Sequence, residues 1–301
     1  VDSPVNTATQ PSAGASDAMT VLFCVDRRYA TAAAVAVASL ASNASPEGGL
    51  DVWLLHDGLP QDKLELIRRA ASGCNIRLLE HEVLAEQLAL PVRSDYISAA
   101  TFGRFLVGHI LPDSCERVLY LDCDILILKG LGPLWELDLE GHILAAAVEY
   151  TAPTLGSERG LEHVRELGLP PLFPYFNAGV LLIDLRAWRQ ERVGERAARY
   201  VADRRPKRMD QDALNAVVAG RWMQLDPIWN VANHWYRTRW SQCRNRRLLR
   251  DARIVHYVGH RKPWVRDDLW QGDQWLAYLW SLFPVAEPAV ARPSDRPGRF
   301  R

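Results

Sequence analysis

The chain has 301 residues, of which 48% are hydrophobic and 24% are charged, so it can bury a substantial core. Lysine plus arginine and aspartate plus glutamate both number 36, and this balance leaves no overall basic field to favour nucleic acid binding. The 5 cysteines are odd in number and include no C-x-x-C pair, which argues against a disulfide framework or a zinc site and fits a reducing cytosol.

The two ends of the chain differ in composition from the middle. Residues 1–18 are rich in Ser, Ala, Thr and Pro and lack the basic-then-apolar order of a signal peptide, so we expect a disordered tail. Residues 286–301 are Pro- and Arg-rich, and we expect a second disordered tail there. Residues 19–285 should form one domain. No stretch reaches the roughly 18 consecutive apolar residues of a membrane span, so a cytoplasmic protein is expected.

Short β-like runs alternate with helical patterns along this domain. The opening predicts strand, helix, strand, helix and strand at Thr20–Val25, Thr31–Ser42, Leu50–Leu55, Gln61–Ser72 and Asn75–Leu79. Later strands are expected at Ile143–Glu149, Ala178–Leu185, Trp222–Leu225 and Arg253–Val258. The alternation predicts an α/β fold with right-handed crossovers and a mixed, mainly parallel sheet flanked by helices.

Asp26 closes the first strand, and Tyr29 follows three residues later. No glycine-rich dinucleotide fingerprint stands at this position, which disfavours a redox nucleotide enzyme. The Asp26 carboxylate could accept hydrogen bonds from a base or a ribose, and the Tyr29 ring could stack on a base. A cap at a helix entry plus a core aromatic explains the same two residues equally well.

The run Leu119–Ile127 carries Asp122 and Asp124 inside an otherwise apolar sequence. Val118–Leu121 is typical of a strand buried on both faces of an α/β sheet. Alternate residues of an extended chain face the same way, so both carboxylates should converge beyond the strand's carboxyl end, where ligands bind in open α/β sheets. Oxygen ligands suit Mg²⁺ or Mn²⁺. The alternative is a turn with two solvated aspartates, and Cys123 between them should be a packed thiol.

Other polar groups are expected at the same edge of the sheet. Ser98 should cap a helix through Ile110, on which Arg104 could clamp a phosphate or a carboxylate or be a solvated charge. Asn177 could hold sugar hydroxyls or satisfy a turn. The run Asp210–Asn215 opens a helix expected to bury Leu214, Val217 and Val218 and to stop at Gly220.

The start of that helix has two interpretations. Acids in a first helical turn are favoured by the helix dipole regardless of function. Three consecutive polar residues, Asp210, Gln211 and Asp212, could also bind the hydroxyls of a sugar.

The last motif is HYVGHRKPW, which begins at His256. Its imidazole could be a third protein ligand to Mn²⁺, Gly259 would let the backbone approach a diphosphate, and Lys262 would supply a point charge for that diphosphate. Taken alone, the motif has a simpler interpretation, in which His256 is a hydrogen-bonded histidine at the end of a strand.

Together these motifs resemble the family 8 retaining glycosyltransferases, particularly the bacterial lipopolysaccharide galactosyl- and glucosyltransferases. The resemblance runs from about Met19 to Trp275 and rests on the ordered set VLFCVDRRYA, ATFGRF, RVLYLDCDILI, FNAGVLLIDLRAW, DQDALN and HYVGHRKPW. It implies a GT-A fold, a UDP-sugar that donates galactose or glucose, and a saccharide or glycolipid acceptor.

The resemblance also implies roles for individual residues. Mn²⁺, or Mg²⁺ in its place, would be held by Asp122, Asp124 and His256. The nucleotide would contact Asp26, Tyr29, the Cys123 backbone, Gly259 and Lys262. The donor sugar would contact Arg104, Asn177, Asp210 and Gln211, of which Asp210 and Gln211 are the catalytic candidates. Because an amide is a poor nucleophile, attack from the leaving group's own face is preferred to double displacement.

Some segments depart from the family pattern or leave the acceptor open. Arg27 and Arg28 stand where relatives often carry Asp-Asn, and Glu149 stands where relatives can carry Asp. We expect residues 151–174 to form a lid that faces the acceptor. The aromatic residues Trp229, Trp235, Tyr236 and Trp240 could stack on acceptor sugars or simply pack. The Arg-rich segment Arg237–Arg250 is a candidate for peripheral contact with the inner face of the membrane, or else a solvated helix.

Two rival classes fit parts of the sequence. A non-catalytic sugar-nucleotide-binding relative should have lost part of the metal triad, but all three residues are present. A sugar-nucleotide pyrophosphorylase should carry a glycine-rich phosphate loop near the N-terminus, and residues 26–29 do not supply one. The sequence leaves the donor sugar, the acceptor and the oligomeric state open.

Overall fold

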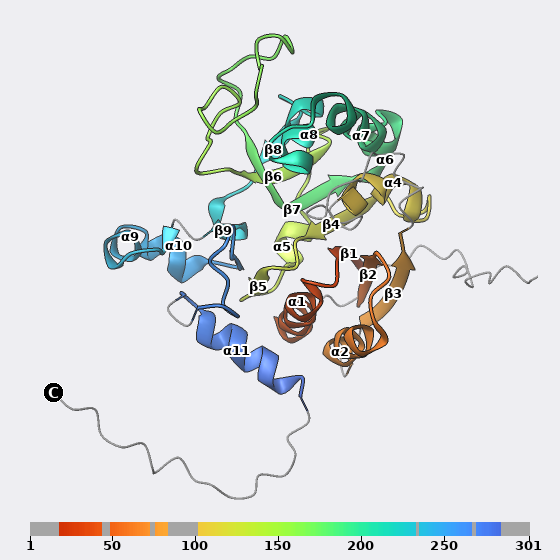
Figure 1. Ribbon diagram of the computed structural model, residues 1–301, viewed down its shortest axis with the longest axis vertical. Helices are drawn as coiled ribbons and strands as arrows, with labels where there is room; N and C mark the ends of the chain where they lie inside the picture. The colour runs from red at the N-terminus through yellow and green to blue at the C-terminus, as the bar shows by residue number, and fades with distance from the viewer. Residues whose placement is uncertain are drawn as a thin grey trace, which may run out of the picture.

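The computed structural model describes residues 18–43, 49–72, 76–83, 102–232, 235–266 and 269–283. Its centre is a 7-stranded sheet in the order β3-β2-β1-β4-β7-β6-β8 (Figure 1). These strands are β1 Met19–Val25, β2 Leu50–His56, β3 Ile76–Glu82, β4 Arg117–Leu121, β6 Leu144–Val148, β7 Phe176–Asp184 and β8 Trp222–Gln224. Only β7 runs antiparallel to its neighbours β4 and β6, so the expected mixed, mainly parallel sheet is confirmed.

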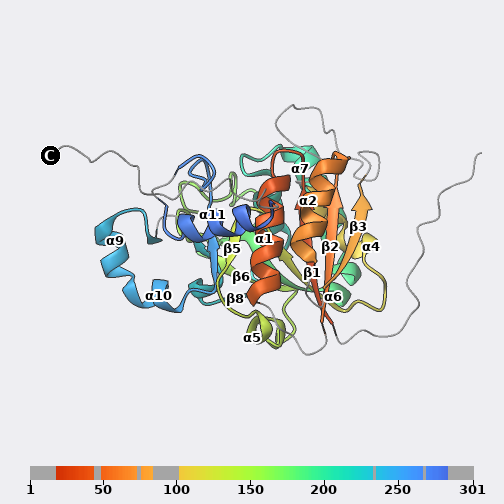
Figure 2. The same ribbon diagram turned by 90° about the horizontal axis from the view of Figure 1, so that it is seen from below.

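Helices cover both faces of this sheet, because its central strands are apolar on both sides. Side chains of β1 alternate between two buried clusters, with Val21 and Phe23 in one and Leu22 in the other. The first cluster lies under α1 Ala30–Asn43 and α2 Gln61–Ala71, which Figure 2 shows side by side on one face. The second lies under α6 Leu185–Gln190, α7 Val193–Arg204 and α8 Met209–Val217.

A smaller 3-stranded sheet carries the C-terminal part of the described chain. Its order is β5-β10-β9, formed by β5 Ile125–Ile127, β10 Ile254–His256 and β9 Val231–Ala232. Strand β10 pairs antiparallel with β5, and His256 stands opposite Ile125 in that register. Further elements are α5 Gly132–Trp135, η3 Pro227–Trp229, α9 Arg239–Arg244, α10 Arg246–Asp251 and α11 Gly272–Ser281. In both views α9 and α10 project from the body of the molecule.

Several expected boundaries were wrong. The expected helix end at Ile110 is confirmed by α4 Val107–Ile110, but a short 3-10 turn, η2 Arg104–Leu106, precedes α4 where one regular helix was expected. The proposed cap Ser98 lies outside the described residues. Helix α8 ends at Val217, before Gly220. Asn177 lies inside β7 rather than before it.

The expected tails, residues 1–18 and 286–301, fall almost entirely outside the described residues. Within the described ranges, no helix combines the length and the apolar composition needed to cross a membrane.

Candidate active site

Asp122 and Asp124 lie in the turn that joins β4 to β5, at the carboxyl end of β4. Strand β4 ends at Leu121, and the chain turns before it resumes as β5 in the second sheet. The premise that the chain stays extended through both acids was therefore wrong. The two carboxylates still lie close together beyond the carboxyl end of β4, where they were expected to converge. Asp124 is 8% exposed, so the alternative of a fully solvated aspartate does not describe it.

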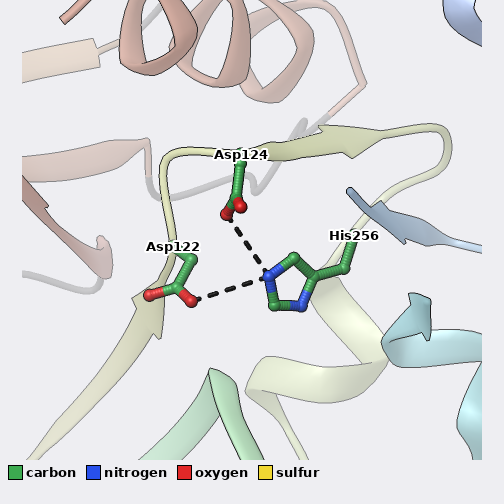
Figure 3. A group of neighbouring side chains, drawn as sticks. All are labelled: Asp122, Asp124 and His256. Atoms are coloured by element: carbon green, nitrogen blue, oxygen red, sulfur yellow. Dashed lines mark ion pairs between the residues drawn. The ribbon is translucent and has the colours of Figure 1, made fainter. Parts of the chain in front are cut away.

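His256 completes a cluster of three potential metal ligands (Figure 3). One ligand atom from each of Asp122, Asp124 and His256 lies within 4.8 Å of the others. The His256 Nε2 atom is 3.6 Å from Asp122 Oδ2 and 3.3 Å from Asp124 Oδ1. Two ligands at about 2.1 Å from one ion stand roughly 3 Å apart when they subtend a right angle, so these separations need little adjustment to hold Mn²⁺ or Mg²⁺.

Each carboxylate gives its second oxygen to a protein donor. Asp122 Oδ1 accepts from the Arg104 guanidinium at 3.0 Å and from the Tyr120 hydroxyl at 2.7 Å. Asp124 Oδ2 pairs with the Lys262 ammonium, which also donates to the Tyr257 carbonyl at 2.7 Å. These contacts fix the orientation of both acids, and they leave Asp122 Oδ2 and Asp124 Oδ1 facing the imidazole.

The charges of this cluster shift the protonation of its members. Burial by itself would raise the pKa of Asp124, but the positive charges of His256 and Lys262 outweigh it and hold that pKa well below its ordinary value. Burial would lower the pKa of His256, but the attraction of Asp124 and Asp122 raises it. Asp124 therefore stays ionised, and a divalent cation would meet a negative charge that it requires.

Arg104 joins the metal cluster to the start of α8. Its guanidinium is 2.9 Å from Asp210 Oδ2 and donates to the Ala178 carbonyl at 3.0 Å, and it lies 4.4 Å from the centre of the Tyr120 ring. Arg104 is only 7% exposed, so the interpretation of a solvated helix charge was wrong. Burial and the Asp210 and Asp122 charges act in opposite directions on the pKa of Arg104, and the net effect raises it.

The three polar residues at the start of α8 do not share one environment. Gln211 Oε1 accepts from the Ala178 N–H at 3.1 Å, and its Nε2 donates to the Tyr175 hydroxyl at 3.2 Å. Asp212 is 1% exposed and accepts from the same hydroxyl at 2.6 Å. Asp212 also accepts from the Arg208 backbone N–H at the start of the helix, whereas Asp210 pairs with Arg104 and Gln211 bonds to β7.

The residues that were expected near the nucleotide differ in their contacts and in their distance from the metal cluster. Asp26 Oδ1 accepts from the backbone N–H groups of Arg28 and Tyr29, both at 2.9 Å, so it makes the helix-entry cap. The half-buried Tyr29 ring lies 5.4 Å from Lys262 Nζ, which places it beside the metal cluster. Cys123 is buried, and its thiol donates to the Cys24 carbonyl at 3.1 Å. Gly259 has a φ of +76°, and nothing lies within 4 Å of a Cβ placed there.

Two features of the site were missed from the sequence. Gly179 in β7 packs directly against the metal cluster, since a Cβ there would lie 2.2 Å from His256 Cε1 and 2.8 Å from Asp122 Oδ2. Asn230 bonds to the second nitrogen of His256 at 2.9 Å. The FNAG string contained Gly179 as a small residue before an apolar strand, but no local pattern around Asn230 indicated a contact with a histidine so far along the chain.

The aromatic residues and the segment that were expected near the acceptor differ in their exposure to solvent. Trp229 and Tyr236 are buried, whereas Trp240 is 68% exposed. The segment 151–174 packs around a small cluster of its own, made by Ala152, Leu155, Leu161 and Tyr175. Leu172, near the end of the segment, is 85% exposed, and Figure 1 shows the segment as a projection beside β6 and α8.

The fold and its relatives define this chain as a glycosyltransferase of the GT-A type. It belongs to Glycosyl transferase family 8, whose model matches residues 20–268. The solved galactosyltransferase in complex with donor and acceptor sugar analogs is 28% identical, covers 89% of this chain and 98% of its own, and superimposes with a TM-score of 0.70.

Curated relatives extend over most of the chain. General stress protein A of Bacillus subtilis is 26% identical over 258 residues, which is 82% of this chain and 87% of that protein. The lipopolysaccharide 1,3-galactosyltransferase of Salmonella typhimurium is 24% identical over 94% of this chain and 80% of its own length. The lipopolysaccharide 1,2-glucosyltransferase of Escherichia coli is 24% identical over 89% and 75%. The resemblance inferred from the motifs is confirmed.

Proposed function

We propose that this chain is a retaining hexosyltransferase that moves galactose or glucose from a UDP-sugar to a hydroxyl of a saccharide or glycolipid, with Mn²⁺ as cofactor. The observation that carries the proposal is the convergence of Asp122, Asp124 and His256 at the carboxyl end of β4 in a family 8 chain. The similarity to a galactosyltransferase that binds donor and acceptor sugar analogs supports the substrate class. One imidazole beside two carboxylates favours Mn²⁺ over Mg²⁺, because Mg²⁺ prefers oxygen ligands throughout.

The residues of the site suit departure of a diphosphate. Bound by the three ligands, Mn²⁺ would neutralise negative charge on UDP as it leaves. Lys262 holds a second positive charge beside Asp124, and Arg104 holds Asp122 and Asp210 in place. The proposed donor-sugar contacts are Arg104, Asn177, Asp210 and Gln211. The open space beside Gly259 is where the backbone would approach the diphosphate.

Retention is proposed to proceed by attack on the same face that UDP leaves, with a diphosphate oxygen accepting the proton of the acceptor hydroxyl. The Gln211 amide is a poor nucleophile, and its Oε1 already accepts the Ala178 N–H. A solved relative studied as an active-site mutant, in which glutamine is replaced by glutamate, supports an active-site role for such a side chain. Mass spectrometry after incubation with donor alone tests the route, since a sugar covalently attached to Gln211 or a neighbouring carboxylate would overturn it.

The test of the overall proposal is UDP release from a panel of UDP-sugars, with and without Mn²⁺. The wild type should release UDP from one donor in a Mn²⁺-dependent manner, and Asp124→Asn should abolish the release. Asp113→Asn, at an exposed acid outside the site, is the matched control and should behave as wild type. UDP binding without release from any donor, even with saccharide acceptors present, would favour a non-catalytic binding protein. Pyrophosphate formed with UTP and a sugar phosphate would favour a pyrophosphorylase.

We also propose that α9 and α10 meet the anionic inner face of a membrane, where a glycolipid acceptor would be found. The segment that contains these two helices has six exposed arginines, Arg237, Arg239, Arg244, Arg246, Arg247 and Arg250. No residue of α10 is buried, and Trp240 in α9 is 68% exposed. Arginines together with an exposed tryptophan are suited to an anionic lipid surface.

Vesicle sedimentation tests this surface. Binding to vesicles that contain phosphatidylglycerol should fall in Arg244→Ser/Arg247→Ser and should be weak to pure phosphatidylcholine. The control is Arg199→Ser/Arg204→Ser, which removes the same charge from α7 on another side of the molecule (Figure 1). Unchanged binding in the first double variant would refute the proposed surface.

A further inference from the structure

A series of hydrogen bonds between buried polar side chains begins at the His256 nitrogen that faces away from the metal cluster. The His256 Nδ1 atom, on the side of the ring away from the two acids, is 2.9 Å from Asn230 Oδ1. Asn230 Nδ2 donates to Asn177 Oδ1 at 2.9 Å, and Asn177 Nδ2 donates to Glu149 Oε2 at 2.9 Å. The four residues are between 3% and 8% exposed, so water does not compete freely for these bonds.

The direction of every bond in this series follows from its last member. An ionised carboxylate can only accept, so Asn177 must present its NH₂ group to Glu149 and its oxygen to Asn230. The Gly179 N–H donates to the same Asn177 oxygen at 3.0 Å, which is consistent only with that orientation. Asn230 must then present its NH₂ group to Asn177 and its oxygen to His256. The proton between Asn230 and His256 therefore belongs to Nδ1.

At the end of this series of hydrogen bonds, Glu149 is held in its ionised form. Its Oε1 accepts from the Thr151 backbone N–H at 3.0 Å and from the Thr151 hydroxyl at 2.8 Å. That hydroxyl in turn accepts from the Arg208 guanidinium at 3.1 Å. Burial would raise the pKa of Glu149, but the hydrogen bonds from Asn177 and Thr151 and the charge of Arg208 outweigh it, and the net effect lowers that pKa.

We propose that Glu149, Asn177 and Asn230 are positioning residues that hold His256 as the Nδ1–H tautomer, with the lone pair of Nε2 aimed between Asp122 and Asp124. This inference rests on the proposed metal site in one respect, since the aim of Nε2 matters only if an ion binds there. Without an acceptor at Nδ1, the ring can carry its proton on Nε2 and block the ligand nitrogen. Loss of such an outer partner typically weakens metal binding by about 10- to 100-fold.

The test uses the full-length protein and two readouts that do not depend on transferase activity. Asn230→Leu removes the acceptor with little change in size. The free Mn²⁺ signal in electron paramagnetic resonance gives the affinity, which should fall by about 10- to 100-fold. Long-range ¹H–¹⁵N spectra of metal-free protein labelled in histidine give the tautomer, at a pH where the ring is neutral. His256→Gln identifies the His256 signals.

Two further variants separate this role from a general loss of stability. Asn230→Asp keeps an acceptor for Nδ1 and should keep the Nδ1–H tautomer. Asn43→Leu removes a half-buried amide that bonds to the Ser39 and Ile127 carbonyls, away from the site, and should leave both readouts unchanged.

The outcomes distinguish this inference from the proposed function. Wild-type His256 with its proton on Nε2 would overturn the inference, as would an unchanged tautomer and an unchanged affinity in Asn230→Leu. If wild type bound no Mn²⁺, the proposed metal site would fail. The metal-free spectra would then decide the tautomer alone, and a change in Asn230→Leu that Asn230→Asp reverses would still support the inference. If Asn230→Leu does not fold, the His256 tautomer in the spectra of wild type and Asn230→Asp still tests the inference.

Discussion

Replacing Gly179 by alanine should damage the metal site while adding only one methyl group. The new Cβ would lie 2.2 Å from His256 Cε1, 2.8 Å from His256 Nδ1 and 2.8 Å from Asp122 Oδ2. Ordinary contact begins near 3.4 Å, so the ring has to withdraw by about 1.2 Å if the strand stays in place. The strand cannot easily give way, because the Gly179 carbonyl accepts from the Asp122 N–H at 2.8 Å.

A shift of this size is large on the scale of metal coordination. Ligand distances in functional metal sites hold to within about 0.2 Å, and a misplacement of about 1 Å at a reacting centre can cost roughly 100-fold. Gly179→Ala should therefore weaken Mn²⁺ binding by about 100-fold or more. Overpacking of this kind also costs about 1–3 kcal/mol of unfolding free energy, so the variant should remain folded but melt earlier.

The assay is Mn²⁺ binding followed by electron paramagnetic resonance, with urea denaturation of the same samples. Gly132→Ala is the matched control, because a Cβ at Gly132 meets nothing within 4 Å. That variant should bind Mn²⁺ and unfold as wild type does. Wild-type Mn²⁺ affinity in Gly179→Ala, in a protein whose wild type binds the ion, would refute the reasoning from steric contact.

Three further predictions test the charges and thiols around the site. Arg104→Met leaves Asp122 and Asp210 without the cation that they share, so the free energy of unfolding should fall by about 3 kcal/mol. Arg104→Lys should lose less. Urea denaturation that shows no loss in either variant would contradict the pairing. The pKa of Glu149 is lowered in the folded state, so its ionised form contributes stability above its ordinary value of 4.5, and that contribution is lost as the pH falls through the folded-state pKa. The stability difference between wild type and Glu149→Gln should therefore be larger at pH 7 than at acidic pH, and a difference that grows on acidification would be the wrong sign. Burial raises the pKa of the Cys123 thiol well above its ordinary value, whereas Cys243 is exposed; mass spectrometry of the native protein after iodoacetamide treatment should find Cys243 alkylated well before Cys123, and the reverse order would contradict the packed position of Cys123.

Much of the main sheet could be predicted from local patterns. The apolar run Thr20–Val25 and the alanine-rich run that follows it became β1 and α1 within a residue or two at each end. Burial on both faces makes such strands continuously apolar, and that is visible without knowledge of their partners. The 3-10 turn at Arg104 and its ion pairs were less predictable, because Asp122 and Asp210 lie far along the chain from Arg104.

By itself the sequence determined which residue types are available for chemistry and roughly where the main strands lie. Asp122, Asp124 and His256 stood out because polar groups beside apolar strands are unusual, and the ordered motifs indicated the family. Only the tertiary structure decided how these groups meet, since β5 leaves the main sheet and pairs with β10 in the second. The place of Gly179 and the partnership of Asn230 with His256 depend on that long-range pairing, which no local periodicity encodes.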